Sequence, residues 1–363
     1  MRTYGRWLLY STAAVVVVAG AVAVTAVAQS GSAQPDPAPL GAAQAESVLP
    51  GPTTAAVNWT STVSARSGRP SAIVSLGDSY MAGEGGRWKG NSADAAAGHQ
   101  GTDRGSQVYG YTDINGCHRS DVAEIISAGL PVRKTINLAC AGAQTVNVLR
   151  ESVGGVDFKG EAPQNDQLAT VAKNNDVKLI VLSIGGNDFG FSKIVTGCVA
   201  AFLQNTKPCK SKEASILAGL PKVTAAVTAT LADVRATMAT AGYKPEEYRL
   251  VLQSYPSFAP SKSRYVGTAA DDRAKTGGCP FLDTDVSWAR KVLLPALTDG
   301  LAGVAKQTGT QFLDLRDAFQ GHEPCAASAK QSTGDPSSAS SEWFRFVDMN
   351  GQGSTSESLH PNY

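Results

Sequence analysis

A serine on a short turn and a histidine near the end of the chain are the residue types that acyl transfer through a nucleophile requires. Ser79 follows the apolar run Ile73-Val74-Ser75-Leu76 in a Gly-Asp-Ser turn, which would expose its hydroxyl. His360 lies far downstream, in Ser358-Leu359-His360-Pro361. In such a pair, the serine oxygen attacks a carbonyl carbon and the histidine accepts the serine proton. The two residues therefore predict chemistry on an acyl group.

Two more glycine-bearing turns lie between the serine and the histidine. They are Cys140-Ala141-Gly142-Ala143 and Gly185-Gly186-Asn187-Asp188, and each could direct an N–H or amide donor at a developing oxyanion. Taken alone, each is an ordinary turn in which a polar side chain stabilises the backbone. The order of all four turns is more informative than any one of them, and it favours catalysis over four unrelated turns.

Short apolar runs alternate with longer amphipathic ones from about Ser71 onward. The strand-like runs are 72–76, 135–138, 178–184, 249–254 and 311–315, and the helix-like stretches are 119–128, 165–174, 213–241 and 285–308. Strands separated by helices predict parallel crossover connections and a sheet covered on both faces. The pattern therefore predicts an α/β domain, a three-layer α/β/α sandwich with a five-stranded parallel sheet. Ser79, Gly142 and Asn187 each follow a predicted strand, and in such sheets sites form outside the carboxyl ends of strands.

The first 28 residues have the pattern of an export signal. Arg2 and Arg6 precede the uncharged segment 7–25, and Ala26-Val27-Ala28 is a small-x-small cleavage site. The alternative is a retained membrane anchor, because the uncharged segment approaches spanning length. Residues 29–70 are rich in Ala, Pro, Ser, Thr and Gly, which predicts a flexible linker. We therefore expect a secreted protein with its folded domain at 71–363, or one held at a membrane by an uncleaved N-terminal segment.

Charge and cysteine content argue against several classes of protein. The 363-residue chain has 32 basic and 31 acidic residues, so its net charge of +1 gives no basis for nucleic-acid binding. Its six cysteines suit an oxidising compartment, and the sequence has no C-x-x-C pair to suggest zinc. Sequence alone does not choose among the possible pairings of six cysteines. The histidines other than His360 lack the spacing of metal ligands, so we expect no metal.

The four blocks resemble those of the SGNH (GDSL-type) hydrolases, in order: Gly77-Asp78-Ser79, Gly142, Gly185-Gly186-Asn187-Asp188 and His360. The resemblance extends over about 71–363 and looks closest to the secreted bacterial lipase/esterase branch with three disulfides. It implies a flavodoxin-like α/β/α fold and no cofactor. It also implies that Ser79 is the nucleophile, that His360 is the general base, and that the oxyanion donors are the Ser79 N–H, the Gly142 N–H and the Asn187 side chain. The disulfides that it implies are Cys117–Cys140, Cys198–Cys209 and Cys279–Cys325.

Two departures from the family pattern concern His360. An aspartate commonly stands three residues before the histidine, and here that position is Glu357. Its carboxylate could complete a catalytic triad, which is the alternative that we favour from the sequence, or a backbone carbonyl could orient the imidazole instead. Relatives also usually continue into a closing helix, whereas this sequence stops at Tyr363. Either the sequence is truncated or little structure follows His360.

These residues favour a monomeric serine esterase or lipase that hydrolyses small-molecule or lipid esters through an acyl-enzyme. One alternative is the same chemistry on O-acetyl groups of a polysaccharide, and another is a non-catalytic binding module on the hydrolase fold. The long segment 84–116 is too polar to indicate a lipid lid, and we expect Glu84 within it to be solvated. An α/β-hydrolase is disfavoured because the Gly-x-Ser-x-Gly sequence does not occur.

Overall fold

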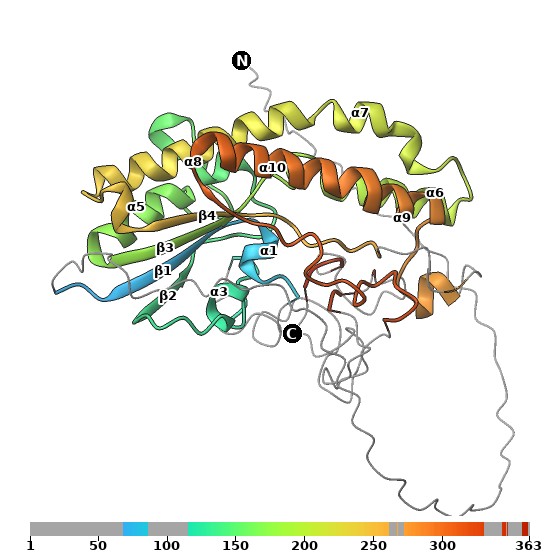
Figure 1. The fold of residues 1–363 in the computed structure, drawn as a ribbon, viewed down its shortest axis with the longest axis horizontal. Coiled ribbons are helices and arrows are strands. Elements are labelled where there is room, and N and C mark those ends of the chain that lie inside the picture. The colour runs from blue at the N-terminus through green and yellow to red at the C-terminus, as the bar shows by residue number, and fades with distance from the viewer. Residues whose placement is uncertain are drawn as a thin grey trace, which may run out of the picture. The chain divides into compact units, whose positions relative to one another are not determined.

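Five parallel strands form a sheet in the order β2-β1-β3-β4-β5 (Figure 1). The computed structural model describes residues 68–85, 115–260, 267, 272–329, 343–345, 347 and 358–361. All four strand pairings are parallel, so the predicted five-stranded parallel sheet is confirmed. The strands are β1 Ser71–Gly77, β2 Lys134–Asn137, β3 Asp176–Ser183, β4 Arg249–Gln253 and β5 Gln311–Leu313.

Helices cover both faces of the sheet (Figure 1). On one face, α5 (Gln164–Asn174), α8 (Leu220–Thr240) and α10 (Leu294–Thr308) pack over the larger apolar core. On the other face, α1 (Ser79–Ala82) and α3 (Glu124–Ser127) pack over a smaller one. Successive residues of the central strands alternate between the two cores, as expected of strands buried on both faces. The three-layer α/β/α prediction is therefore confirmed.

The remaining helical segments are shorter, or lie outside these two layers. These segments are α4 Thr145–Val148, α6 Phe191–Leu203, α7 Glu213–Leu217 and α9 Asp283–Trp288, with 3-10 turns at Glu151–Val153, Cys209–Lys212 and Pro245–Glu247 and π-helical turns at Asp272–Thr276 and Ala289–Leu293.

Among the described residues no single helix is long and apolar enough to cross a membrane. The segments Cys209–Leu217 and Leu220–Thr240, which meet at a bend of 52°, are together long and apolar enough by length and composition.

Two of the predicted helices are interrupted, and each interruption precedes a proline. The expected helix 213–241 is α7 followed by α8, with Gly219 between them and Pro221 in the first turn of α8. The expected helix 285–308 starts as α9, passes through a π-helical turn and continues as α10, which has Pro295 in its first turn. Proline has no N–H to donate to the preceding turn, so it fits the start of a helix and not its interior.

The expected helix 119–128 is helical only as α3, in its second half. Before α3, the Arg119 guanidinium donates to the Ala139 carbonyl (2.7 Å) and forms an ion pair with Glu161. These contacts hold the segment in an irregular conformation beside the sheet. A helix that we did not predict, α6, spans Phe191–Leu203 directly after Gly190, which has a left-handed φ of +75°.

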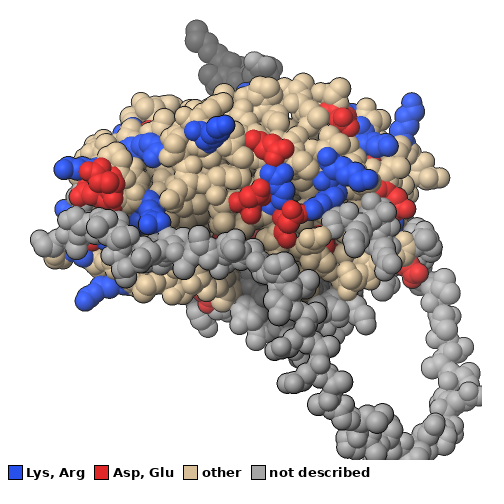
Figure 2. Space-filling model, viewed as in Figure 1, with Lys and Arg blue, Asp and Glu red and all other residues tan. Residues whose placement is uncertain are grey.

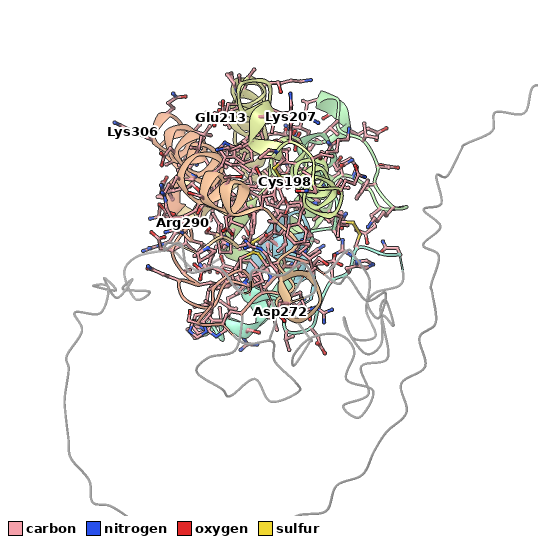
Figure 3. The ribbon with its side chains drawn as sticks, turned by 90° about the vertical axis from the view of Figure 1, so that its right-hand side faces the viewer. Cys198, Lys207, Glu213, Asp272, Arg290 and Lys306 are labelled. Atoms are coloured by element: carbon pink, nitrogen blue, oxygen red, sulfur yellow. A yellow bond between two sulfur atoms is a disulfide. The ribbon has the colours of Figure 1, made fainter. Side chains whose placement is uncertain are left out.

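Three disulfides pair all six cysteines. They are Cys117–Cys140, Cys198–Cys209 and Cys279–Cys325, which are the pairs that the family resemblance implied. Figure 3 labels Cys198, which lies in α6 and is joined to the 3-10 turn that starts at Cys209. Cys140, which is bonded to Cys117, lies two residues before Gly142, and the Ala141 N–H donates to the Cys117 carbonyl (2.9 Å). A disulfide therefore restrains the turn that carries Gly142.

Basic and acidic side chains are interspersed on the face of the molecule that Figure 2 shows. Ion pairs also form between charged side chains of the domain. Arg316, for example, contacts Asp299 (2.7 Å) and Asp314 (2.8 Å), and Arg290 contacts Asp317. Exposed pairs of this kind add little to stability. On this face, the near-neutral composition is expressed as mixed charge and not as a single-sign patch.

Candidate active site

The predicted nucleophile Ser79 begins α1, directly after the carboxyl end of β1. Gly77, the last residue of β1, has a φ of +135°, and a Cβ there would lie 2.0 Å from the Ser183 carbonyl oxygen of β3. Only glycine allows this approach of the two strands at the turn. Asp78 caps α1, because its carboxylate accepts a hydrogen bond from the Tyr80 N–H (3.1 Å). The turn leaves Ser79 partly exposed.

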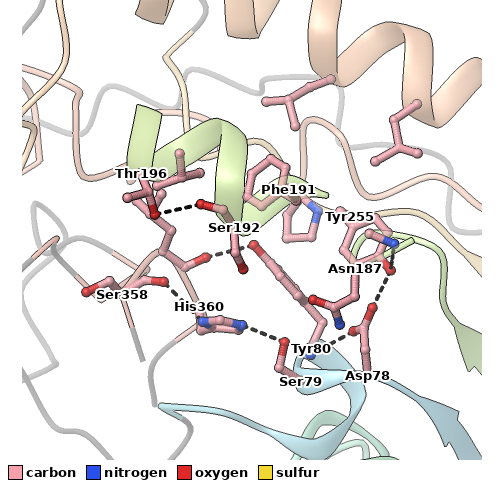
Figure 4. Close-up of a pocket in the computed structure, with 16 residues that line it drawn as sticks. Asp78, Ser79, Tyr80, Asn187, Phe191, Ser192, Thr196, Tyr255, Ser358 and His360 are labelled. Carbon is pink, nitrogen blue, oxygen red and sulfur yellow. Dashed lines mark hydrogen bonds between the residues drawn. The ribbon is translucent and has the colours of Figure 1, made fainter. Parts of the chain in front are cut away.

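His360 contacts the Ser79 hydroxyl across 281 residues of sequence. Its Nε2 lies 2.7 Å from Ser79 Oγ, and its Nδ1 lies 3.1 Å from the Ser358 carbonyl oxygen (Figure 4). A carbonyl oxygen only accepts hydrogen bonds, so this contact requires the tautomer with its proton on Nδ1. In that tautomer Nε2 is free of a proton and can accept a hydrogen bond from the serine O–H. That is the tautomer a general base needs. Glu357, the predicted acid, lies outside the described residues, and the contact to Ser358 is the kind of backbone support that the sequence left open.

The predicted oxyanion donors lie on neighbouring turns at the strand ends. The Asn187 side-chain amide donates to the Ala143 carbonyl (2.9 Å), which brings the Gly142 turn beside it. An amide group has two N–H bonds, so one remains for a substrate oxygen. Gly142 has a φ of +86° and is exposed. Within the part of the chain that the structure describes, the N–H groups of Ser79 and Gly142 make no hydrogen bond.

Asp188 joins the same two turns by a second route. Its carboxylate accepts from the Thr145 N–H (3.0 Å) and from the Thr145 hydroxyl (2.5 Å), at the first residue of α4. The Gln144 side-chain amide adds a longer bond to the Asn187 carbonyl (3.3 Å). The turns that carry Gly142 and Asn187 are therefore held together by several hydrogen bonds, and Asp188 has the turn-stabilising role expected of an aspartate at such a position.

A buried network lies beneath Ser79. Asp78 is 1 % exposed, and its carboxylate accepts a hydrogen bond from the Tyr255 hydroxyl, which in turn accepts from the Gly186 N–H (2.9 Å). Burial raises the pKa of Asp78 from 3.8 to about 7, with a further contribution from the negative charge of Asp188, against the opposing effect of the hydrogen bonds from Tyr255 and Tyr80. Tyr255 thus links the turn of the serine to the turn of Asn187.

The raised pKa of Asp78 predicts that the folded state loses stability as pH rises. Between about pH 4 and about pH 7 the folded chain keeps the Asp78 proton that the unfolded chain releases, so the free energy of unfolding falls across this window. The full effect is on the order of 4 kcal/mol for a shift of about three units. Asparagine at position 78 cannot ionise. We therefore expect Asp78→Asn to lose much less stability between about pH 4 and about pH 8 than the native protein does.

Urea unfolding of the native protein and of Asp78→Asn at both pH values measures this difference. Burial also raises the pKa values of Glu124 and Glu323, so both proteins share that part of the slope and the comparison isolates Asp78. Identical pH dependence in the two proteins would exclude Asp78 as the titrating group.

A cavity of about 300 Å³ opens beside the serine and the histidine (Figure 4). Ser79, Asn187 and His360 line its polar end. The opposite wall is largely apolar and comes from two helices, with Phe191 and Val195 from α6 and Leu294 and Leu297 from α10. The arrangement fits a polar reacting group at the strand ends with an apolar substituent directed between the helices.

The cavity brings together most of the residues singled out from the sequence, and adds others. Gly142 adjoins Asn187 but does not line the cavity. Tyr80 and Tyr255 line it and had not been identified. Tyr80 directly follows the serine motif, which was the one available signal for it. No sequence pattern marked Tyr255, whose position depends on how β4 ends.

One expectation about a loop residue was wrong. Glu84 is 1 % exposed, and both of its carboxylate oxygens lie within 2.9 Å of His118 Nδ1. A buried carboxylate is stable only with partners of this kind, so Glu84 is a structural residue directly after α1. The sequence had suggested a solvated side chain because the surrounding segment is polar.

One group of side chains in the described part of the chain has the spacing of metal ligands. It consists of Cys198, Cys209 and Asp285, all buried. The two sulfur atoms are bonded to each other as a disulfide, so neither can act as a thiolate ligand. The Asp285 carboxylate instead accepts hydrogen bonds from the N–H groups of Cys209 (3.1 Å) and Lys210 (3.0 Å).

The parallel sheet and the serine, histidine and asparagine at its carboxyl edge define a hydrolase of the SGNH type. The chain belongs to the GDSL-like Lipase/Acylhydrolase family, which it matches over residues 75–363, and it is accordingly a carboxylic ester hydrolase.

Several characterised proteins are similar to this chain. Lipase 1 of Streptomyces coelicolor is 27 % identical over 278 residues, which cover 74 % of this chain and 80 % of that protein. Among solved structures, the extracellular lipase from Streptomyces rimosus is 21 % identical, with a TM-score of 0.45 over 80 % of this chain and 93 % of that one. The phospholipase A1 from Streptomyces albidoflavus is 23 % identical, with a TM-score of 0.46 over 81 % of this chain and 93 % of that one.

Proposed function

We propose that this chain is an exported serine esterase or lipase that forms an acyl-enzyme on Ser79 with His360 as general base. The observation that carries the proposal is the contact of His360 Nε2 with Ser79 Oγ (2.7 Å) while Nδ1 faces a carbonyl oxygen. In the first step, Ser79 Oγ bonds to the ester carbonyl carbon and its proton passes to Nε2. The resulting imidazolium then donates that proton to the departing alcohol, and a water molecule repeats the sequence to release the acid.

The tetrahedral intermediate of each step carries a negative oxygen. In our proposal it accepts hydrogen bonds from the Ser79 N–H, the Gly142 N–H and the second amide N–H of Asn187. Donors held in place before reaction stabilise this charge without having to reorganise. The bonds between Asn187 and Ala143 and between Asp188 and Thr145 support such pre-organisation.

The proposed orienting group for His360 is the Ser358 carbonyl. The neutral carbonyl fixes the tautomer, although it stabilises the imidazolium less than a carboxylate would. A triad completed by Glu357, which lies outside the described residues, is the competing arrangement. The two arrangements predict different kcat/KM values for Glu357 variants.

The apolar wall of the cavity favours a fatty acyl ester over an acetylated sugar. Phe191, Val195, Leu294 and Leu297 offer an apolar surface that an acetyl group would not fill, although α6 also places the hydroxyl side chains of Ser192 and Thr196 in the cavity. The relatives named lipase and phospholipase A1 agree with this preference. An O-acetyl esterase acting on a polysaccharide and a non-catalytic binding module are the competing functions.

Export is proposed from the sequence and the disulfides together. Residues 1–28 would be the signal, 29–70 a linker and 71–363 the hydrolase domain, and three disulfides suit an oxidising compartment. N-terminal sequencing of protein recovered from the medium would identify the cleavage site. A chain that starts at Met1 and sediments with membranes would support the retained anchor instead.

The proposed function is tested with a series of p-nitrophenyl esters from acetyl to long acyl, and with a phospholipid and an acetylated polysaccharide. We expect medium to long acyl esters to have the highest kcat/KM, and a fluorophosphonate probe to label the native protein but not Ser79→Ala. Hydrolysis that is unchanged in Ser79→Ala would remove the proposed mechanism. Activity confined to the acetylated polysaccharide would support the first competing function, and a folded protein without labelling or hydrolysis would support the second.

A further inference from the structure

The loop that carries His360 has a strained backbone. Leu359 has a φ of +60°, a left-handed conformation that non-glycine residues rarely adopt, and its side chain is 2 % exposed. Such a conformation persists only where the surroundings hold it. Because Nδ1 of His360 is supported by Ser358, two residues away in the same loop, the orientation of the imidazole depends on how firmly the loop itself is fixed.

The loop is held from two sides. On one side, the Arg345 N–H donates to the His360 carbonyl (2.8 Å) and the Leu359 N–H donates to the Arg345 carbonyl (3.0 Å). On the other side, the Tyr80 hydroxyl donates to the Leu359 carbonyl (2.7 Å). The Tyr80 ring also lies against the imidazole, with 4.8 Å between ring centroids (Figure 4). The second side comes from the element that carries the nucleophile.

Tyr80 is covalently adjacent to Ser79 and is itself restrained. Its N–H donates to the Asp78 carboxylate (3.1 Å), and its ring packs edge-on against Tyr255, with 5.0 Å between centroids. A single side chain therefore connects the turn of the serine to the loop of the histidine, and both ends of the connection are fixed. Movement of the loop relative to Ser79 would break the hydroxyl contact and the ring contact together.

We propose that Tyr80 is a positioning residue, whose hydroxyl bond to Leu359 and ring contact with His360 hold the imidazole Nε2 against Ser79 Oγ. The proposal rests on the function proposed above, and it adds a group that acts through His360 and not on the substrate. It accounts for how a histidine supported by a neutral carbonyl keeps a fixed orientation.

The test compares Tyr80→Phe, which keeps the ring and removes the hydroxyl, with Tyr243→Phe as a matched control. Tyr243 is more buried than Tyr80, and its hydroxyl donates to the Asn175 carbonyl (2.5 Å) and accepts from the Val177 N–H (3.0 Å), but it does not line the cavity. For a p-nitrophenyl ester, we expect Tyr80→Phe to lower kcat about ten-fold with little change in KM. Tyr243→Phe should lower the melting temperature at least as much and keep kcat within about two-fold.

A second measurement separates positioning from general loosening. In a His360→Ala background, Tyr80→Phe should cause no further loss of the residual hydrolysis, because the group that it positions is absent. Native kcat in Tyr80→Phe, or an equal loss with and without His360, would overturn the inference. If His360→Ala itself keeps the native rate, the proposed function fails as a whole, which is a different result from a fully active Tyr80→Phe beside an inactive His360→Ala.

Discussion

Alanine at His360 is expected to lower kcat by about 10⁴-fold or more, because it removes the proposed acceptor of the Ser79 proton. Nε2 is the one histidine nitrogen within hydrogen-bond distance of Ser79 Oγ in the described part of the chain. KM should change little, since His360 acts on charge that develops during reaction. Ser79→Ala should be about equally inactive, and the double variant no worse than either single one, because the two residues act as a unit.

Glu357 provides the discriminating comparison. If the Ser358 carbonyl orients the imidazole, Glu357→Ala and Glu357→Gln should each keep kcat/KM within about ten-fold of native, since the carbonyl remains. If Glu357 is the third member of a triad, both variants should approach His360→Ala. Loss of its charge would also shift the acidic limb of the pH profile downward, because the carboxylate that raised the histidine pKa is gone.

The measurement is kcat and KM of His360→Ala, Ser79→Ala, Glu357→Ala and Glu357→Gln between about pH 5 and about pH 9. A native-like Glu357→Gln beside an inactive His360→Ala would establish a serine–histidine pair supported by backbone. Near-native activity in His360→Ala would contradict the mechanism, whatever the Glu357 variants show.

The sheet could be predicted from the sequence because its central strands are buried on both faces. In β1 and β3 an almost continuous apolar run is bounded by glycine or polar turns, and this pattern has few other structural solutions. The ends of the helices were harder to predict from the sequence. Pro221 and Pro295 mark real helix starts inside segments whose apolar periodicity continues across the break.

The helix α6 shows why part of the site was missed. Its sequence is more apolar on average than those of α5, α8 and α10, although its apolar side chains gather on one face about as clearly as those of α10. Its partly buried residues Phe191 and Val195 face the cavity, where a substrate would cover them. The apolar composition of α6 suits it to an apolar ligand, and its amphipathic pattern was a signal in the sequence that was not used.

Tyr255 and Glu84 were missed for a different reason. Tyr255 acquires its role through contacts with Asp78 and Gly186, which come from two other strand ends. Glu84 is buried because His118, 34 residues away, folds onto it. Neither relation has a local signature, since each depends on tertiary packing. The turns of the candidate site could be predicted because their composition, and their order along the chain, can be read directly from the sequence.

Alanine at Asn187 is expected to lower kcat by about 10²–10³-fold, the usual loss for one oxyanion donor. Its amide would donate to an oxygen that is fully charged only in the tetrahedral intermediate, so KM should change little. Asn187→Asp keeps the size of the side chain but replaces the donor by a carboxylate. It should be at least as inactive as Asn187→Ala, because its charge would repel the oxyanion.

Asn187 also donates to the Ala143 carbonyl, so its removal both deletes a donor and loosens the Gly142 turn. Thr145→Val separates these effects: it removes the hydroxyl bond to Asp188, which joins the same two turns, and leaves every proposed donor in place. We expect Thr145→Val to lower kcat by less than about ten-fold.

Gly142→Pro removes a donor N–H, and proline also cannot adopt the φ of +86° found there. The loss of kcat in Gly142→Pro should therefore exceed that in Asn187→Ala. Steady-state measurements of kcat and KM for the Asn187, Thr145 and Gly142 variants test these expectations, and their melting temperatures check that each variant is folded. A Thr145→Val enzyme as slow as Asn187→Ala would mean that the asparagine acts mainly by holding the two turns together, and native kcat in Asn187→Asp would exclude it from the oxyanion hole.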